Sequence, residues 1–255
     1  MPELQLEAIK VMTNAFRQME ALLPPPKRHP LKGSFVFRFE NKGIHEVLIQ
    51  KLARYISGLN AIEVLLEAGY TQEIGVLFRT LDEIQEDCFF LASAETNGAR
   101  TERHTQYLDA FYADVVSSRP EGELRISKPN MLPRKKVRAH TVNTLGQGIN
   151  QSNMLDASES VGAAYSGYVH AASENIMEMY GGNPPWFHLE GLSGTPFVTT
   201  FTRELETYIY RGLIAVALTA KAFGDKALVE ALYEFLAKYE LGNGHEVPKA
   251  GLAVT

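Results

Sequence analysis

Cysteine is almost missing from this sequence, since Cys88 is the only one among 255 residues. A single thiol excludes an internal disulfide and any zinc site built from cysteines. It is also typical of proteins in a reducing compartment. We therefore expect a cytoplasmic protein without disulfide bonds.

Long hydrophobic runs are missing too. The longest, "GLIAVALTA" at 212–220, is less than half of the roughly 20 residues needed to cross a bilayer. The first residues, "MPELQLEAIKVMTNAF", carry Glu3, Glu7 and Lys10 and lack the apolar core of a signal peptide. We expect no membrane association.

The sequence also lacks an excess of positive charge and the common metal and nucleotide motifs. Its formal charge of −5 argues against nucleic-acid binding by overall charge, although a local basic patch can still serve. No glutamate is followed three residues later by a histidine, as di-iron bundles require, and there is no H-E-x-x-H, P-loop or G-x-G-x-x-G motif. We expect no metal and no cofactor.

Proline is missing from three long stretches, 31–119, 134–183 and 197–247, which favours helices separated by proline-marked loops. Within these stretches apolar residues recur with a period near 3.6. The pattern predicts helices over about 3–22, 43–68, 71–95, 99–117, 134–145, 156–180, 197–223 and 225–240. The second half of the helix at 197–223 is apolar on nearly every side, so we expect it to be deeply buried.

Strand signals are poor by comparison. "SFVFRF" at 34–39 is suitable for a short extended piece, but no partner for it is evident nearby. The sequence therefore predicts a single all-α bundle of seven to eight helices over residues 1–255. Its expected parts are an N-terminal helix and Pro-rich loop at 3–30, a core bundle at 43–223, an irregular loop near 181–196, and a C-terminal helix with a loose tail at 225–255.

The helix at 71–95 has charged residues on a face where they need an explanation. One face of it carries Ile74, Leu77, Phe78, Leu81, Ile84 and Cys88, and the opposite face carries Val76, Arg79, Glu83, Glu86 and Phe90. An ordinary surface face does not need Val76 and Phe90 among its charges. If the helix is central and covered on both sides, the pair Arg79–Glu83 is buried or half-buried and needs partners. The alternative is a solvent-exposed pair of little energetic value.

The helix expected at 156–180 places His170 opposite its apolar stripe of Val161, Tyr165, Tyr168, Ala172, Ile176 and Met179. Small residues around His170 would let a second helix approach closely. His170 is therefore either an acid–base residue or a structural or solvent-facing histidine.

Two segments carry a family resemblance, "LFRTLDE" at 77–83 and "YSGYVHA" at 165–171. Together they resemble uncharacterised bacterial helical proteins with R-[ST]-x-x-E and Y-x-x-x-V-H signatures. That family is similar in outline to the HEPN superfamily of helical bundles, which occurs in toxin–antitoxin and phage-defence systems. The resemblance spans roughly residues 45–225, and it implies that Arg79, Glu83 and His170 meet inside the bundle.

Active HEPN ribonucleases carry an R-x(4–6)-H motif whose histidine performs acid–base chemistry on RNA, and here the sequence departs from them. No arginine precedes His170 at that spacing, and the formal match is Arg134 with His140. Lys135 follows Arg134 where the active families usually keep a small polar residue. Chance alone supplies about one such match in a chain of this composition.

The sequence offers further candidate binding residues besides Arg79, Glu83 and His170. Lys135, Lys136 and Arg138 form a compact basic patch that is either a phosphate-binding surface or a solvated helix start. Trp186 lies in the irregular loop and either plugs the core or belongs to a partner-binding surface. Tyr165 is a further candidate for binding.

Two hypotheses of function follow. In the first, the protein is a binding or regulatory module that acts through a protein partner or its own dimer, in the defence or stress setting that the resemblance implies. In the second, it is a metal-independent ribonuclease of the HEPN type, with His170 as acid–base, Arg79 stabilising phosphate charge and Glu83 beside them. RNA is then the substrate. The departures from the motif favour the first hypothesis.

Overall fold

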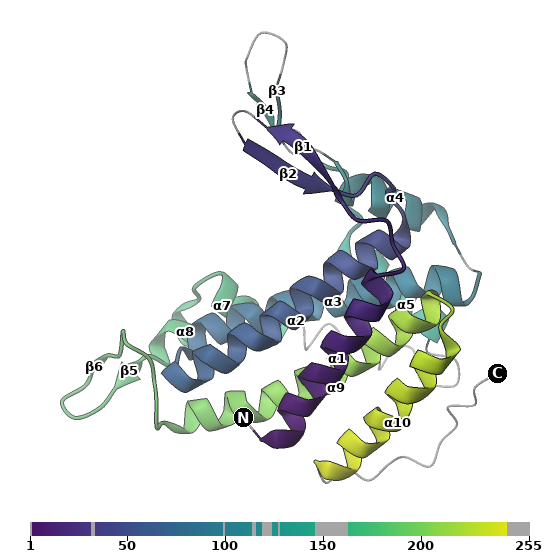
Figure 1. The fold of residues 1–255 in the computed structure, drawn as a ribbon. Helices are drawn as coiled ribbons and strands as arrows, with labels where there is room; N and C mark the ends of the chain where they lie inside the picture. Colours follow the sequence, from purple (N-terminus) through teal and green to yellow (C-terminus); the bar gives the residue numbers. More distant parts are fainter. Residues whose placement is uncertain are drawn as a thin grey trace.

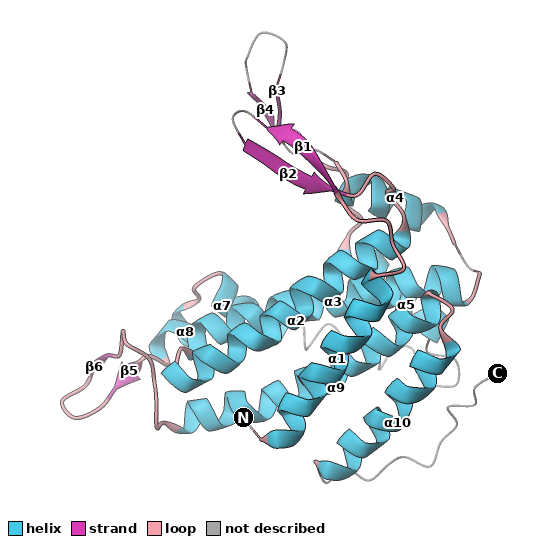
Figure 2. Cartoon of the chain, in the orientation of Figure 1, coloured by secondary structure: helices cyan, strands magenta, loops and turns pink. Residues whose placement is uncertain are grey.

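The predicted proline-free stretches fold into helices, and the fold is all-α (Figures 1 and 2). The computed structural model describes residues 2–31, 34–98, 100–113, 116–118, 124–126, 128–145 and 163–243. The described residues contain nine helices: α1 Glu3–Glu20, α2 Ile44–Ala68, α3 Thr71–Thr96, α4 Glu102–Phe111, α5 Arg134–Leu145, α7 Ser166–Val169, α8 Ser173–Met177, α9 Pro196–Ala222 and α10 Lys226–Gly242. None of these helices is both long and apolar enough to span a membrane.

Three two-stranded antiparallel hairpins accompany the helices in the described chain. Their strands are β1 Lys27–Leu31 with β2 Ser34–Arg38, β3 Val116–Ser118 with β4 Leu124–Ile126, and β5 Tyr180–Gly181 with β6 Trp186–Phe187. The first two hairpins project from one end of the elongated bundle, near α4, and the third projects from the other end, beside α7 and α8 (Figure 1).

The helices α2 and α3 form an antiparallel pair joined at Gly69. This residue ends α2 in the left-handed region, with φ of 77°, where a residue with a Cβ atom would be strained. A Cβ atom here would also lie only 2.3 Å from the backbone nitrogen of Ser193, and the Gly69 carbonyl accepts a hydrogen bond of 2.7 Å from the amide of Leu192. The close contact fixes the loop before α9 against the end of the α2–α3 pair.

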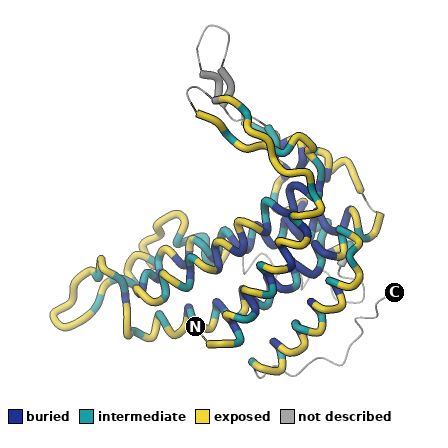
Figure 3. Tube along the Cα trace, in the orientation of Figure 1, coloured by how far each residue is buried: buried dark blue, intermediate teal, exposed yellow. Residues whose placement is uncertain are grey.

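The helix α9 lies at the centre of the bundle and contacts α1, α2, α3 and α10. Its second half is buried as predicted, because Leu213, Val216 and Ala220 are almost inaccessible to solvent. Gly212 lets the Tyr55 ring of α2 approach the α9 backbone, and the Tyr55 hydroxyl donates to the Tyr208 carbonyl at 2.7 Å. Figure 3 shows the buried residues following the long helices, while the β1–β2 and β5–β6 hairpins are largely exposed. Each fully buried large apolar side chain contributes about 1.5–3 kcal/mol to this core.

Two predicted elements are wrong in ways that matter for the site. Residues 34–39 do have a strand partner, because the segment just before them pairs back on β2, with Arg28 opposite Phe37 and Pro30 opposite Phe35. The predicted helix at 99–117 ends at Phe111, and β3 follows it at 116–118.

The predicted helix at 156–180 is wrong over its described part. Residues 156–162 lie outside the described residues, and the rest forms the short helices α7 and α8. The chain breaks between them at Ala171, which has a φ of 50°. This left-handed conformation, unusual for alanine, reverses the direction of the chain. Tertiary contacts described below select the break over a continuous helix.

Candidate functional site

The structure pairs two of the three residues predicted to meet inside the bundle and leaves the third, His170, exposed to solvent. The Arg79–Glu83 pair forms as predicted, at 2.7 Å, with 19% and 44% of the two side chains exposed, so it is half-buried. His170 ends α7 and is exposed to solvent. Among the described residues, no hydrogen bond or ion pair joins it to Arg79 or Glu83. The prediction that His170 turns inward to complete a cluster is therefore wrong.

The interior of the bundle does hold a polar cluster, but it is built on Asp82, which directly precedes Glu83 on α3, rather than on Glu83 itself. Asp82 is buried on α3 and pairs with Arg211 of α9 at 2.8 Å. The Tyr208 hydroxyl donates to the same carboxylate oxygen at 3.0 Å, and Arg211 also donates to Gln85. Burial raises the pKa of Asp82, while the neighbouring guanidinium lowers it. This cluster ties α3 to α9.

A second charged cluster joins α5 to α3, and it includes one of the three residues of the predicted basic patch, Arg138. Arg134 forms ion pairs with Asp87 and, at 2.6 Å, with Glu86. Arg138 donates to Glu86 at 2.6 Å, and only 12% of its side chain is exposed. Lys135 and Lys136 are both exposed. Arg138 is thus held against α3, and the prediction that it lies on a phosphate-binding surface is wrong.

The formal R-x(4–6)-H match also lies in this cluster. Arg134 is committed to the two acidic residues of α3, and His140 shares a hydrogen bond of 3.2 Å with the Ser93 hydroxyl. The His140 ring lies 4.8 Å from the buried His104 ring, and burial lowers the pKa of both histidines. His104 is fixed further by bonds to Thr101 and to the Phe90 carbonyl. Both histidines are therefore explained by packing of α4 and α5 on α3.

A hollow with a volume of about 530 Å³ lies at the opposite end, between the α7–α8 segment and the first turns of α9. It contains two tyrosines and three glutamates. Its lining residues are Ala163, Ala164, Tyr165, Gly167, Tyr168, Ala172, Glu174, Asn175, Glu178, Thr200, Phe201 and Glu204. We call it the acidic hollow.

The carboxylate of Glu178 is held in place from two sides. The Tyr168 hydroxyl lies 2.9 Å from both of its oxygens, and Gln72 of α3 donates to it at 3.2 Å and to the Asn175 carbonyl at 2.8 Å. Burial raises the pKa of Glu178, the two hydrogen bonds offset part of that shift, and the nearby charge of Glu174 adds to it. A cation in the hollow would favour the ionised form.

Two glycines explain why Tyr168 can reach this position. A Cβ atom on Gly75 would lie 2.4 Å from the Tyr168 ring, and one on Gly167 would lie 1.9 Å from Oδ1 of Asn175. Gly75 therefore seats α7 on α3, and Gly167 lets α7 approach α8. These contacts hold the chain reversal at 170–172 and shape the hollow.

An aromatic floor connects the hollow to the interior. The ring of Phe78 stacks on Tyr208 at 4.2 Å and lies 5.2 Å from Tyr165, while Tyr168 meets Phe201 edge-on at 5.9 Å. Burial raises the pKa of Tyr165, and the charge of Glu204, its hydrogen-bond partner, raises it further. The predicted binding residue Tyr165 thus lies in the hollow.

An exposed apolar surface belongs to the same end of the molecule. Sixteen large apolar side chains of the described residues are exposed, and eight of them lie between residues 169 and 197, so they are concentrated there. These eight form what we call the apolar end surface: Val169, Ile176, Met177, Tyr180, Trp186, Phe187, Leu189 and Phe197. Trp186 is 50% exposed and stands in the projecting β5–β6 hairpin, so it does not plug the core.

The chemistry of this end suits a cation. Residues 163–204 contain four glutamates, one arginine, and no lysine or aspartate. No basic side chain lines the acidic hollow. Carboxylates together with tyrosine ring faces form the type of site that binds ammonium and guanidinium groups.

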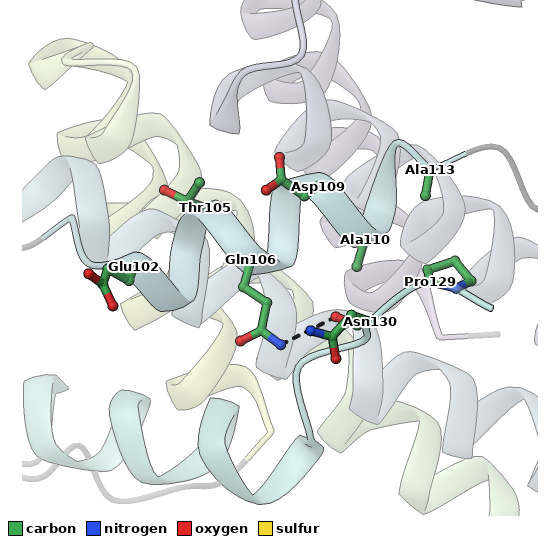
Figure 4. Close-up of a pocket in the computed structure, with 8 residues that line it drawn as sticks. All are labelled: Glu102, Thr105, Gln106, Asp109, Ala110, Ala113, Pro129 and Asn130. Atoms are coloured by element: carbon green, nitrogen blue, oxygen red, sulfur yellow. Dashed lines mark hydrogen bonds between the residues drawn. The ribbon is translucent and has the colours of Figure 1, made fainter. Parts of the chain in front are cut away.

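A second hollow, of about 420 Å³, lies along α4 and offers less (Figure 4). Glu102 and Asp109 are about two helical turns apart, and Figure 4 shows them separated along the helix. Gln106 is already bonded to the Asn130 carbonyl at 3.3 Å. The polar groups do not converge, so we do not assign a site here.

Comparison with family models, curated proteins and solved structures finds no match to this chain. In the described residues, no group of three or more histidine, cysteine, aspartate or glutamate side chains is arranged to hold a metal ion.

Proposed function

We propose that this protein is a binding module whose partner is a protein segment that presents a basic side chain between apolar residues. The concentration of half of the exposed large apolar side chains at one end carries the proposal. Large exposed apolar surfaces on soluble proteins commonly mark interaction sites. The acidic hollow lies in the same segment and adds a preference for positive charge.

The geometry agrees with a binding role because the hollow is built before any ligand arrives. Glu178 is oriented by Tyr168 and Gln72, and Tyr165 packs against the aromatic floor. Preorganised groups lose little conformational entropy on binding. The exposed Trp186 is of the residue type that most often carries binding energy in protein interfaces.

The ribonuclease alternative has less support from the geometry. His170 is exposed, and in the described chain no hydrogen bond or ion pair joins it to Arg79, which pairs with Glu83. Arg134 is neutralised by two acidic residues, so the arginine of each proposed pair already has a carboxylate partner. A defence or stress setting is part of our proposal only through the HEPN resemblance.

Selection of peptides from a random display library on the immobilised protein tests the proposal. We expect enrichment of sequences with arginine or lysine flanked by leucine or aromatic residues. The affinity of the enriched peptides should fall about ten-fold for Glu178→Gln, because one charge-assisted interaction is worth roughly 1.5–3 kcal/mol. Trp186→Ala should weaken binding as well.

Glu230→Gln is the matched control, because Glu230 is an exposed glutamate on α10, away from the hollow. It should bind the peptides as the wild-type protein does. Enrichment of sequences without basic residues, or equal binding by Glu178→Gln, would refute the role of the acidic hollow.

A further inference from the structure

The β1–β2 hairpin at the opposite end has the composition that the acidic hollow prefers. Residues 27–42 contain five lysines and arginines and one glutamate, a net charge of +4, whereas the whole chain carries −5. Residues 163–204, which hold the hollow and the apolar end surface, carry four glutamates and one arginine, a net charge of −3. The two ends of the molecule are therefore oppositely charged.

One face of the hairpin presents a cation between aromatic rings. Residues directly opposite each other in an antiparallel pair point to the same side, so Arg28 and Phe37 share a face with Pro30 and Phe35. The guanidinium carbon of Arg28 lies 4.5 Å from the ring centre of Phe35 and 5.7 Å from that of Phe37. This arrangement is a basic side chain flanked by apolar ones.

That face is not used by the bundle. Phe35 and Phe37 are 46% and 58% exposed, and β1 and β2 have their substantial contacts with each other rather than with a helix of the described chain. Figure 1 shows the hairpin projecting away from the helices. Both aromatic rings and Arg28 are accessible to a second molecule.

We propose that the occupant of the acidic hollow and the apolar end surface is the β1–β2 hairpin of a second copy of this chain. The inference rests on the proposed function and names its partner. Arg28 of the second copy enters the acidic hollow, and its two phenylalanines cover the apolar end surface. Charge complementarity carries this assignment, since the hairpin is the basic element and the hollow the acidic one.

Complementarity also decides the kind of assembly. If two acidic ends packed on each other around a two-fold axis, Glu174, Glu178 and Glu204 would face like charges. The β1–β2 hairpin and the α7–α8 segment, which lines the acidic hollow, lie at opposite ends of an elongated molecule (Figure 1). In the head-to-tail contact that we propose, each added copy leaves one free end of each kind. Such contacts produce rings or open chains rather than closed dimers.

Complementation between two variants tests the proposal. The hairpin variant is Arg28→Glu/Phe37→Ala, and the end variant is Glu174→Arg/Trp186→Ala; all four side chains are exposed, so both variants should fold. We expect the wild-type mass in analytical ultracentrifugation to rise with concentration beyond that of a dimer. Each variant alone should stay monomeric. An equimolar mixture should form a heterodimer and nothing larger. One molecule of each variant supplies one intact hairpin and one intact acidic end, and these two bind each other.

Glu230→Arg/Val64→Ala is the matched control, with one exposed charge and one exposed apolar residue changed elsewhere, and it should assemble as the wild type does. A wild-type protein that stays monomeric at high concentration, or a hairpin variant that still assembles, overturns the proposal. Peptide binding by the acidic hollow is measured separately on the hairpin variant. If the hairpin variant binds peptides but the wild-type protein does not assemble, only the identity of the partner is refuted. If the hairpin variant does not bind peptides, the proposed function is refuted.

Discussion

At the level of single residues, Arg211 compensates the buried charge of Asp82. The side chain of Asp82 is 2% exposed and depends on the guanidinium and on the Tyr208 hydroxyl for its partners. Replacing a member of a buried ion pair leaves the other charge unmatched, which costs more than the pair itself contributes. The Tyr208 hydroxyl donates a hydrogen bond to the carboxylate but, being neutral, does not match its charge.

We expect Arg211→Met to lower the free energy of unfolding by about 3–5 kcal/mol, measured by urea denaturation. Burial already raises the pKa of Asp82, and loss of Arg211 raises it further, so the folded variant binds a proton more readily than the unfolded chain does. Acidification from about pH 7 towards about pH 4 should therefore reduce the deficit. Arg203→Met, an exposed arginine of the same helix, should have little effect. A deficit that does not change with pH would show that Asp82 is not its source.

At the level of elements, Arg134 makes three of the polar contacts that attach α5 to α3. This side chain contacts Glu86, Asp87 and the Glu83 carbonyl, whereas Lys135 points to solvent. We expect Arg134→Ala to lower the free energy of unfolding by about 2–3 kcal/mol, because Lys51 still neutralises Asp87. Lys135→Ala should change it by less than about 0.5 kcal/mol. Equal effects in chemical denaturation would contradict this attachment of α5.

The long helices were predictable from the sequence because their apolar periodicity and the proline positions act locally. The bounds of α2, α3 and α9 agree with the prediction to within one residue. The apolar character of the second half of α9 also indicated its burial correctly. Coverage of α3 on both sides, which the sequence left open, is found in its second half, where Phe90 is fully buried, whereas Val76 in its first half is exposed.

The short elements were not predictable because distant residues decide them. The break between α7 and α8 depends on the space that Gly75 leaves for Tyr168 and on the contact of Gly167 with Asn175. These contacts override a local preference for one continuous helix. The β1–β2 hairpin was missed because its first strand contains a proline, which weakens the strand signal.

The candidate site was therefore only partly predictable. Tyr165 and Trp186 do lie at the α7–α8 end. His170, which was predicted on the same helix as Tyr165, is exposed to solvent after the break. Glu178 and Glu204 were missed because they belong to different elements, and only the chain reversal brings both to the hollow. No spacing within one segment indicates that pair.

At the level of the whole molecule, two kinds of charge interaction occupy different places. The pairs of Asp82 and Asp87 lie inside the bundle, with 2% and 3% of the acidic side chains exposed. The excess charges of the hairpin and of the acidic end lie at the two exposed ends of the molecule. Salt screens exposed charges strongly and buried pairs much less.

Salt should therefore weaken the assembly but change the stability of the fold very little. We expect the dissociation constant of the head-to-tail contact to rise about ten-fold between low salt and about 1 M, where the screening length falls to about 3 Å. The urea midpoint of the hairpin variant, which stays monomeric, should change little over the same range, because its core is apolar and the carboxylates of Asp82 and Asp87 form their ion pairs inside the bundle. Sedimentation and denaturation measured in the same buffers check both expectations. Assembly that strengthens with salt would mean that the aromatic residues Phe35, Phe37 and Trp186 dominate the contact and that the opposite charges of the two ends do not direct it.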